Sequence, residues 1–139
     1  MSQTTGVDPS LFSVTWYEEG RFSYEPKNGP HGDGTADIGP GQLSPGVWDK
    51  APYTSGLRNP FGTNREVGQV FNGNPVENLL LTAYALNSLP GSRANKAGLY
   101  KAGSVEGPGY QKRVNNFNSH VKGYDAFYSC LAQRGFKAP

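Results

Sequence analysis

The chain has 139 residues, of which 35% are hydrophobic and 12% aromatic, so it fits one folded domain over residues 1–139 and not a disordered chain. Its net charge of +2, without a cluster of Lys and Arg, does not suit a nucleic-acid partner, and no run of about 18 apolar residues predicts a membrane span. Cys130 is the single cysteine, which excludes an internal disulfide and a metal site built on several cysteines.

The first seven residues are expected to form a flexible N-terminus, and they lack the basic and then apolar layout of a signal peptide. Asp8 and Pro9 predict a helix start, because aspartate accepts a backbone N–H and proline has none to lose. The helix over residues 9–19 carries large apolar side chains in almost every direction, which predicts a central, buried helix. Glu18 and Glu19 end this helix, at the negative end of its dipole.

Glycine and proline interrupt residues 23–62 every few positions, so no helix of useful length fits there. We expect an irregular lobe with a short hairpin, and Trp48, Tyr53 and Phe61 either form its small core or line a cleft. Irregular stretches of this length are uncommon in a compact domain and usually carry a function.

Three more helices are predicted after the lobe. Asn74 and Pro75 start the first, with Glu77 placed to complete a capping box, and a proline and glycine end it at residues 90–91. A shorter helix spans about residues 93–101, and a last one spans about residues 111–134. Gly123 is a point at which the last helix is expected to break in two, and Gly135 is its expected C-terminal cap. The predicted fold class is therefore mainly α, of the α+β kind.

A carboxylate at the end of a buried helix, facing a glycine-rich lobe, suits general acid catalysis. An apolar wall raises the pKa of a glutamate from about 4.3 toward about 6, where part of it stays protonated near neutral pH. Cleavage of a glycosidic bond needs such an acid, because the departing sugar oxygen must be protonated. Position alone does not separate Glu18 from Glu19, and ordinary surface carboxylates are the alternative.

Four segments follow the order of the motifs of the bacterial lytic transglycosylases. Glu19-Gly20-Arg21-Phe22 resembles the family's Glu-Ser-Arg-Phe, and Gly39-Pro40-Gly41-Gln42-Leu43 resembles its Gly-Leu-Met-Gln. Asn74-Pro-Val-Glu-Asn78-Leu resembles its Asp-Pro-x-x-Asn-Ile, and Leu99-Tyr100-Lys101-Ala102-Gly103 resembles its Ala-Tyr-Asn-Ala-Gly. The resemblance covers about residues 8–131 and implies a lysozyme-like fold, which goose-type lysozymes share. Gly32-Asp33 is spaced from Gln42 much as in the goose-type pattern.

The resemblance implies a role for each matching residue. Glu19 is the implied catalytic acid and base, and Gln42, Asn78, Tyr100 and Lys101 are the implied substrate-binding residues. Two positions depart from the family. Gly20 replaces a serine whose hydroxyl would orient the acid, and Lys101 replaces an asparagine. A lysine near Glu19 would stabilise the ionised carboxylate.

The implied function is cleavage of peptidoglycan between N-acetylmuramic acid and N-acetylglucosamine. Glu19 protonates the bond, the substrate's acetamido group stabilises the cation, and Glu19 then deprotonates the sugar's 6-hydroxyl to give a 1,6-anhydro product. No metal or cofactor is expected. The expected partner is the glycan strand, met by a monomer in the periplasm or outside the cell. Delivery then requires a removed signal, phage-type release or injection as an effector.

Two alternatives stay open. A hydrolytic muramidase, an endolysin or a chitinase-like glycosidase needs a second carboxylate, about 5–5.5 Å away if retaining or about 6.5–9.5 Å away if inverting. Asp33 and Asp37 in the lobe are the candidates for it. The other alternative is a non-catalytic wall-binding or structural module of a secretion or phage-tail apparatus, which Gly20 and Lys101 favour. The lobe lacks the helix-flanked loop of an EF-hand, so no metal site is predicted there.

Overall fold

The computed structural model of this chain describes residues 6–22, 27–28, 37–38, 41–42 and 75–135. Its described helices are α2 (Pro9–Gly20), α5 (Pro75–Ser88), α6 (Arg93–Ala102) and α7 (Tyr110–Gln133). Two short strands, β1 (Lys27–Asn28) and β2 (Asp37–Ile38), pair antiparallel. The predicted mainly α class is confirmed, and a short hairpin lies within the segment for which one was predicted. Within these ranges, no helix has the length and apolarity to cross a membrane.

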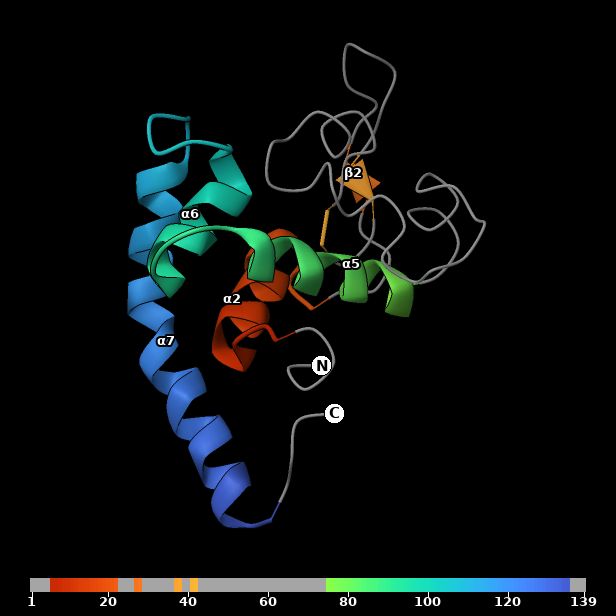
Figure 1. The fold of residues 1–139 in the computed structure, drawn as a ribbon, viewed down its shortest axis with the longest axis vertical. Helices are drawn as coiled ribbons and strands as arrows, with labels where there is room; N and C mark the ends of the chain where they lie inside the picture. The colour runs from red at the N-terminus through yellow and green to blue at the C-terminus, as the bar shows by residue number, and fades with distance from the viewer. Residues whose placement is uncertain (1–5, 23–26, 29–36, 39–40, 43–74, 136–139) are drawn as a thin grey trace.

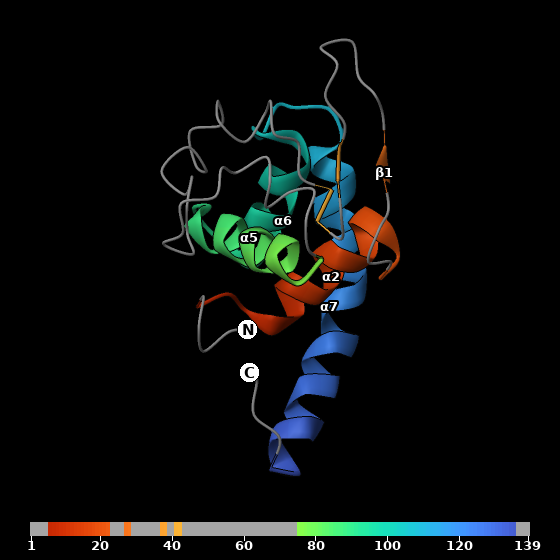
Figure 2. The same ribbon diagram turned by 90° about the vertical axis from the view of Figure 1, so that its right-hand side faces the viewer.

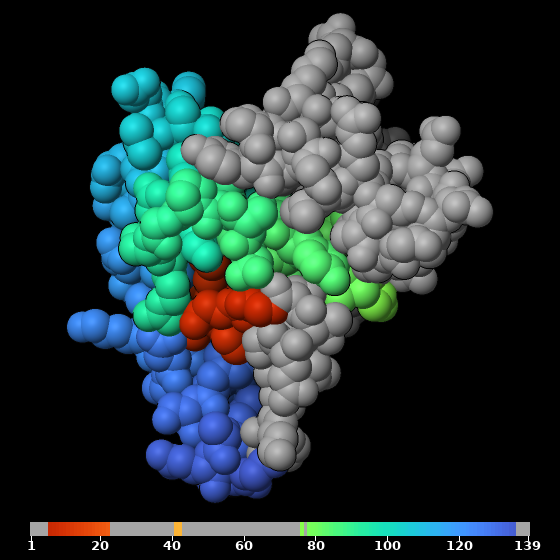
Figure 3. Space-filling model, in the orientation of Figure 1, coloured from red at the N-terminus to blue at the C-terminus, as the bar shows by residue number. Residues whose placement is uncertain are grey.

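Helix α2 lies among the other helices and contacts α5, α6 and α7 (Figure 1, Figure 2). Asp8 caps it as predicted, because its Oδ1 accepts the N–H of Leu11 at 3.0 Å, and Pro9 follows at the first helical position. Every residue from 10 to 15 is buried, including three polar ones. In the view of Figure 3, only a small part of α2 is visible between α5, α6 and α7. The central, buried helix is therefore confirmed.

The hydrophobic core draws on all four described helices, on Val7 before α2 and on Leu89 after α5. Its buried members are Val7, Leu11, Phe12, Val14, Leu79, Ala83, Leu86, Leu89, Ala97, Leu99, Phe117 and Val121. Burying one large side chain of this kind contributes about 1.5–3 kcal/mol, so this cluster is the main source of stability in the helical body. Val76, which has the helical spacing of the apolar stripe of α5, is exposed.

The ends of the later helices agree with local sequence signals. The Oγ of Ser92 caps α6 by accepting the N–H of Asn95 at 3.1 Å. Helix α7 is continuous through Gly123, so the predicted break there is wrong. A glycine inside a helix costs about 1 kcal/mol relative to alanine, which is less than the burial of Phe117 in the same helix contributes. Gly135, with φ of +87°, follows α7 as expected.

A surface ion-pair network ties the start of α2 and the start of α6 to the middle of α7. Arg93 donates from Nη1 and Nη2 to the two carboxylate oxygens of Asp125, at 2.8 and 3.1 Å. The same arginine lies 3.4 Å from Asp8, and the hydroxyl of Ser10 donates to Asp125 at 2.5 Å. These contacts fix the register of three helices at the end of α2 that lies away from Glu19.

Candidate active site

Glu19 lies in the last turn of α2, in an ion pair with Arg113 from the first turn of α7. The Nη1 of Arg113 is 2.8 Å from the Oε1 of Glu19, and the two side chains are only 6% and 12% exposed respectively. Among the described residues this Nη1 has no aligned hydrogen bond, so Arg113 acts on the carboxylate as a nearby charge. An opposite charge at this distance stabilises the ionised carboxylate. The poorly solvated setting expected for Glu19 therefore includes a cation, which opposes the expected rise of its pKa.

Helix dipoles explain why these two charges meet. Glu19 lies at the negative end of α2 and Arg113 at the positive end of α7, and each placement is unfavourable when taken alone. Because the two helix ends lie together, each charge is beside a helix end of the opposite sign. The ion pair thus offsets two unfavourable dipole interactions as well as two desolvation costs.

Arg113 is the neighbour of Glu19 that the sequence interpretation missed. It is spaced four residues before Phe117 and eight before Val121, so it belongs to the buried stripe of α7. A charged residue on such a stripe is rarely buried without a partner of opposite charge. That irregularity in the stripe was the available signal, but it does not say which carboxylate is the partner.

The chain turns sharply after Glu19. Arg21 and Phe22 both have left-handed backbone angles, with φ of +53° and +64°. The turn folds the ring of Phe22 back on Trp16 and Tyr17, at 5.4 Å between centroids in each case. A bulky residue in this conformation costs about 1–3 kcal/mol, and such strain clusters at functional sites.

A third residue with positive φ, Gln42, follows Gly41, whose backbone is bound by side chains from α5 and α6. The N–H of Gly41 donates to the Oδ1 of Asn78 at 3.0 Å, and the hydroxyl of Tyr100 donates to the carbonyl of Gly41 at 2.6 Å. Gln42 itself has φ of +50°. The structure thus brings together Gln42, Asn78 and Tyr100. Asn78 and Tyr100 bind the backbone of Gly41, next to Gln42. Asn78 is only 1% exposed, so its side chain is not open to a substrate.

Only glycine fits at position 41. A Cβ there would lie 1.8 Å from the Oγ1 of Thr82 and 2.9 Å from the hydroxyl oxygen of Tyr100. Thr82 is fully buried, and its hydroxyl donates to the carbonyl of Asn78 at 2.9 Å. The close approach of the backbone to α5 is therefore part of how this turn is positioned.

Lys101, the remaining substrate-binding candidate, points to a different neighbour in the described part of the chain. Lys101 is exposed, and its side chain lies along Gly109, with Cγ and Cε 3.4 Å from the place where a Cβ of that glycine would be. Among the described residues, the cation paired with Glu19 is Arg113, a role that the sequence had raised for Lys101 if it lay nearby. Asp33 and the side chain of Asp37, the candidate second carboxylates, lie outside the described residues. Trp48, Tyr53 and Phe61 lie outside them as well.

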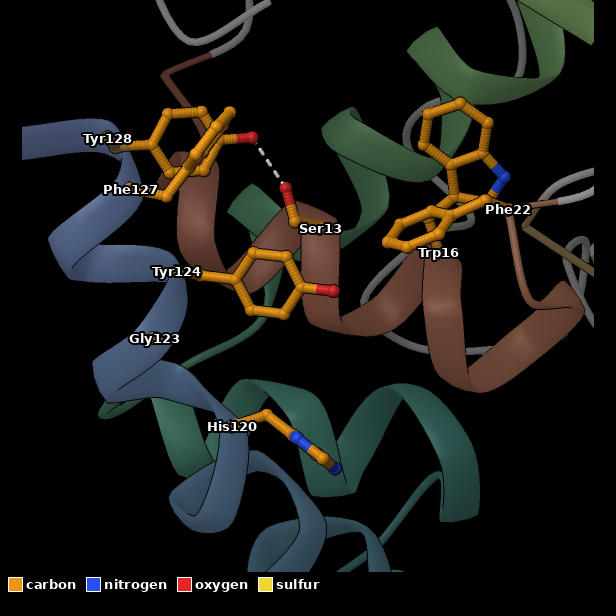
Figure 4. A pocket seen from close by; sticks show the side chains of 8 residues that line it. All are labelled: Ser13, Trp16, Phe22, His120, Gly123, Tyr124, Phe127 and Tyr128. Carbon is orange, nitrogen blue, oxygen red and sulfur yellow. Dashed lines mark hydrogen bonds between the residues drawn. The ribbon is translucent and has the colours of Figure 1, made fainter. Parts of the chain in front are cut away.

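A separate hollow of about 590 Å³ lies between α2 and α7, and Figure 4 shows the side chains around it. Its lining is mainly aromatic: Ser13, Trp16, Phe22, His120, Gly123, Tyr124, Phe127 and Tyr128. The hydroxyls of Ser13 and Tyr128 are hydrogen-bonded to each other at 2.6 Å. Burial, followed by nearby phenols and Glu18, raises the pKa of Tyr124. Of the predicted catalytic and substrate-binding residues that the structure describes, none lines this hollow.

Neither a search for metal-ligating side chains nor a comparison with known proteins assigns a function to the described residues. In the part of the chain that the structure describes, no three His, Cys, Asp or Glu side chains are grouped to hold a metal ion. The chain matches no family model, no curated protein and no solved structure. Functional inference therefore depends on the geometry of the residues themselves.

Proposed function

We propose that this protein is a peptidoglycan lytic transglycosylase with a lysozyme-like fold, and that Glu19 is its acid and base. The observation that carries the proposal is the placement of Glu19, a nearly buried carboxylate at the end of a central, buried helix. Backbone strain supports the same place. Among the described residues, the non-glycine residues with positive φ are Arg21, Phe22 and Gln42, and all three belong to the two segments that resemble the family's motifs.

In the proposed reaction Glu19 first donates a proton to the substrate and then accepts another proton from it. The carboxyl proton passes to the glycosidic oxygen, the bond from that oxygen to C1 of N-acetylmuramic acid breaks, and the acetamido oxygen bonds to C1. The carboxylate then accepts the proton of the 6-hydroxyl, whose oxygen bonds to C1 as the acetamido oxygen leaves. The product is a 1,6-anhydro sugar, and the two steps require neither water nor a metal ion.

The residues around the turn at residues 41–42 have two proposed roles, positioning of the backbone and contact with the substrate. Asn78 and Tyr100 are positioning residues, because their polar atoms bind the backbone of Gly41. Gln42 is the proposed substrate contact, since it follows that turn and its backbone is strained. The proposed substrate is the glycan strand in the periplasm or outside the cell, and the proposed active form is a monomer.

Mass spectrometry of digested cell wall tests the proposal. We expect the protein to release 1,6-anhydro fragments from purified peptidoglycan, and Glu19→Gln to reduce their rate of formation by about 10²–10⁴-fold, as loss of a general acid does. Glu18→Gln is the matched control, because this neighbouring carboxylate lies 3.3 Å from Asn116 and has no proposed role in the reaction. Circular dichroism checks the folding of both variants. Undiminished release by a folded Glu19→Gln protein would remove the assignment.

The Glu19–Arg113 ion pair favours one second candidate, a non-catalytic wall-binding or structural module in which the pair only joins α2 to α7. In that case the protein sediments with peptidoglycan and releases no fragments. Hydrated fragments in place of anhydro ones would instead indicate a hydrolase. Asp33→Asn and Asp37→Asn would then identify its second carboxylate.

A further inference from the structure

We propose that Arg113 is the positioning residue of Glu19 and sets the pH range in which Glu19 donates its proton. The inference rests on the proposed function. In that reaction Glu19 is protonated at the start and at the end of each turnover and carries a negative charge in between. Arg113 lies 2.8 Å from the oxygen that bears this charge, in a setting from which water is largely excluded. It therefore stabilises the form of Glu19 that exists between the two proton transfers.

Stability alone does not account for a buried pair at this place. Replacing a buried ion pair with apolar side chains of similar volume is often neutral or stabilising, because desolvation offsets the attraction. Arg113 also continues a stripe whose next members are the apolar Phe117 and Val121, so an apolar residue would suit the packing. The charge is thus better explained by its effect on Glu19 than by the fold.

The other charged groups on α2 and α7 near the pair face different partners. Glu18 lies 3.3 Å from Asn116 of α7. His120 of α7 contacts the ring of Tyr17 at 6.1 Å between centroids, and the guanidinium of Arg21 lies over the same ring, 4.4 Å from its centroid. None of these contacts involves the carboxylate of Glu19.

On the other helices packed on α2, two charged side chains have described contacts away from Glu19. From α6, Arg93 pairs with Asp125 and Asp8 beyond the opposite end of α2, and Lys101 lies along Gly109. The side chain of Glu77 in α5 lies outside the described part of the chain. Among the described residues, Arg113 is the cation paired with Glu19, so its removal tests the proposal.

Two effects of Arg113 on the rate have opposite signs. Its charge reduces the protonated fraction of Glu19 at neutral pH, which moves the alkaline limb of the pH–rate profile to lower pH. The same charge makes the protonated carboxyl a stronger acid, which speeds proton transfer at the plateau. Removing the charge should therefore move the alkaline limb to higher pH and at the same time lower the plateau rate.

The experiment compares the pH–rate profiles of the wild type, Arg113→Met and Arg113→Lys on purified peptidoglycan. Methionine keeps an unbranched apolar stem without charge, and we expect the alkaline limb to move up by about one pH unit or more while the plateau rate falls. Lysine keeps the charge and should hold the limb near its wild-type position. A lower plateau with an unmoved limb would show that Arg113 only supports the fold, and would overturn the proposal. Arg113→Gln is the second neutral variant if the methionine variant does not fold.

A direct titration separates this proposal from the proposed function. The ¹³C resonance of the Glu19 carboxyl, assigned by its absence in Glu19→Gln, reports its protonation without any substrate. We expect a higher titration midpoint in Arg113→Met than in the wild type. If the wild type cleaves no peptidoglycan, the proposed function fails while the titration still measures the effect of Arg113. An equal midpoint in both proteins would overturn the role of Arg113 even if cleavage is observed.

Discussion

Replacing Gly41 with alanine should detach the turn at residues 41–42 from the helices that hold it. The new methyl group would lie 1.8 Å from the Oγ1 of Thr82 and 2.9 Å from the hydroxyl oxygen of Tyr100. Thr82 has no room to yield, because it is fully buried and its hydroxyl is bonded to the carbonyl of Asn78. The turn must therefore move instead.

Two terms set the magnitude of this change. Overpacking a buried site costs about 1–3 kcal/mol. Moving the turn also removes the buried hydrogen bond from Gly41 to Asn78, and losing the partner of a buried polar group costs about 1–3 kcal/mol. The bond from Tyr100 to Gly41 is only partly buried, so no second penalty is added for it. We therefore expect the free energy of unfolding to fall by about 2–6 kcal/mol. Cleavage activity should fall with it, because Gln42 is displaced.

Urea denaturation followed by far-UV circular dichroism measures the effect. Gly123→Ala is the matched control, since a Cβ at that helical position meets nothing within 4 Å and should raise stability by about 0.5–1 kcal/mol. Thr82→Ala introduced into Gly41→Ala should recover part of the loss, because it removes the atom that the methyl group meets. A Gly41→Ala protein as stable as the wild type, or no recovery from the second change, would refute the reasoning.

Three other substitutions test the fold. Hydrogen bonds from Arg93 and Ser10 hold the pKa of Asp125 below its usual value, so its contribution to stability is present above the unfolded-state pKa of about 3.9 and is lost as pH falls through the lower folded-state value. The Tm of Asp125→Asn should therefore lie below that of the wild type at pH 6, and the gap should close toward pH 3; a constant gap contradicts this sign. Leu86→Ala removes a fully buried core side chain and should cost about 2–5 kcal/mol in urea denaturation, whereas less than 1 kcal/mol would mean that this site is not tightly packed. Ser92→Ala removes the cap of α6 and should cost about 1 kcal/mol by the same measurement, with Ser92→Asp as the variant that retains it.

The helices were largely predictable because their signals are local. Asp8 followed by Pro9 marks the start of α2 within the sequence itself, and apolar residues on all sides of the helix indicate its burial. Gly123 shows the limit of such reasoning. A glycine lowers helix propensity wherever it occurs, but the packing of α7 against α2 and α6 decides whether the helix continues, and that packing involves distant segments.

Three of the predicted substrate-binding residues lie together in the structure, but sequence did not reveal what two of them contact. The motifs selected Gln42, Asn78 and Tyr100, which the structure does place around one turn. Sequence could not show that Asn78 binds a backbone N–H, because that contact depends on how closely Gly41 approaches α5. It also could not find the partner of Glu19, since Arg113 is distant in the chain and meets it only where the ends of α2 and α7 come together.

Helix α7 extends beyond the rest of the helical body at its C-terminal end (Figure 1, Figure 2). Its first half is anchored by Phe117 and Val121 in the core, whereas Phe127 is 55% exposed and Cys130 is also exposed. The free energy of local opening should therefore be high in the first half of this helix and low in its last turns. Amide protons near Phe117 should exchange with solvent only when the whole domain unfolds, while those of the last turns should exchange through fraying that leaves the rest of the protein intact.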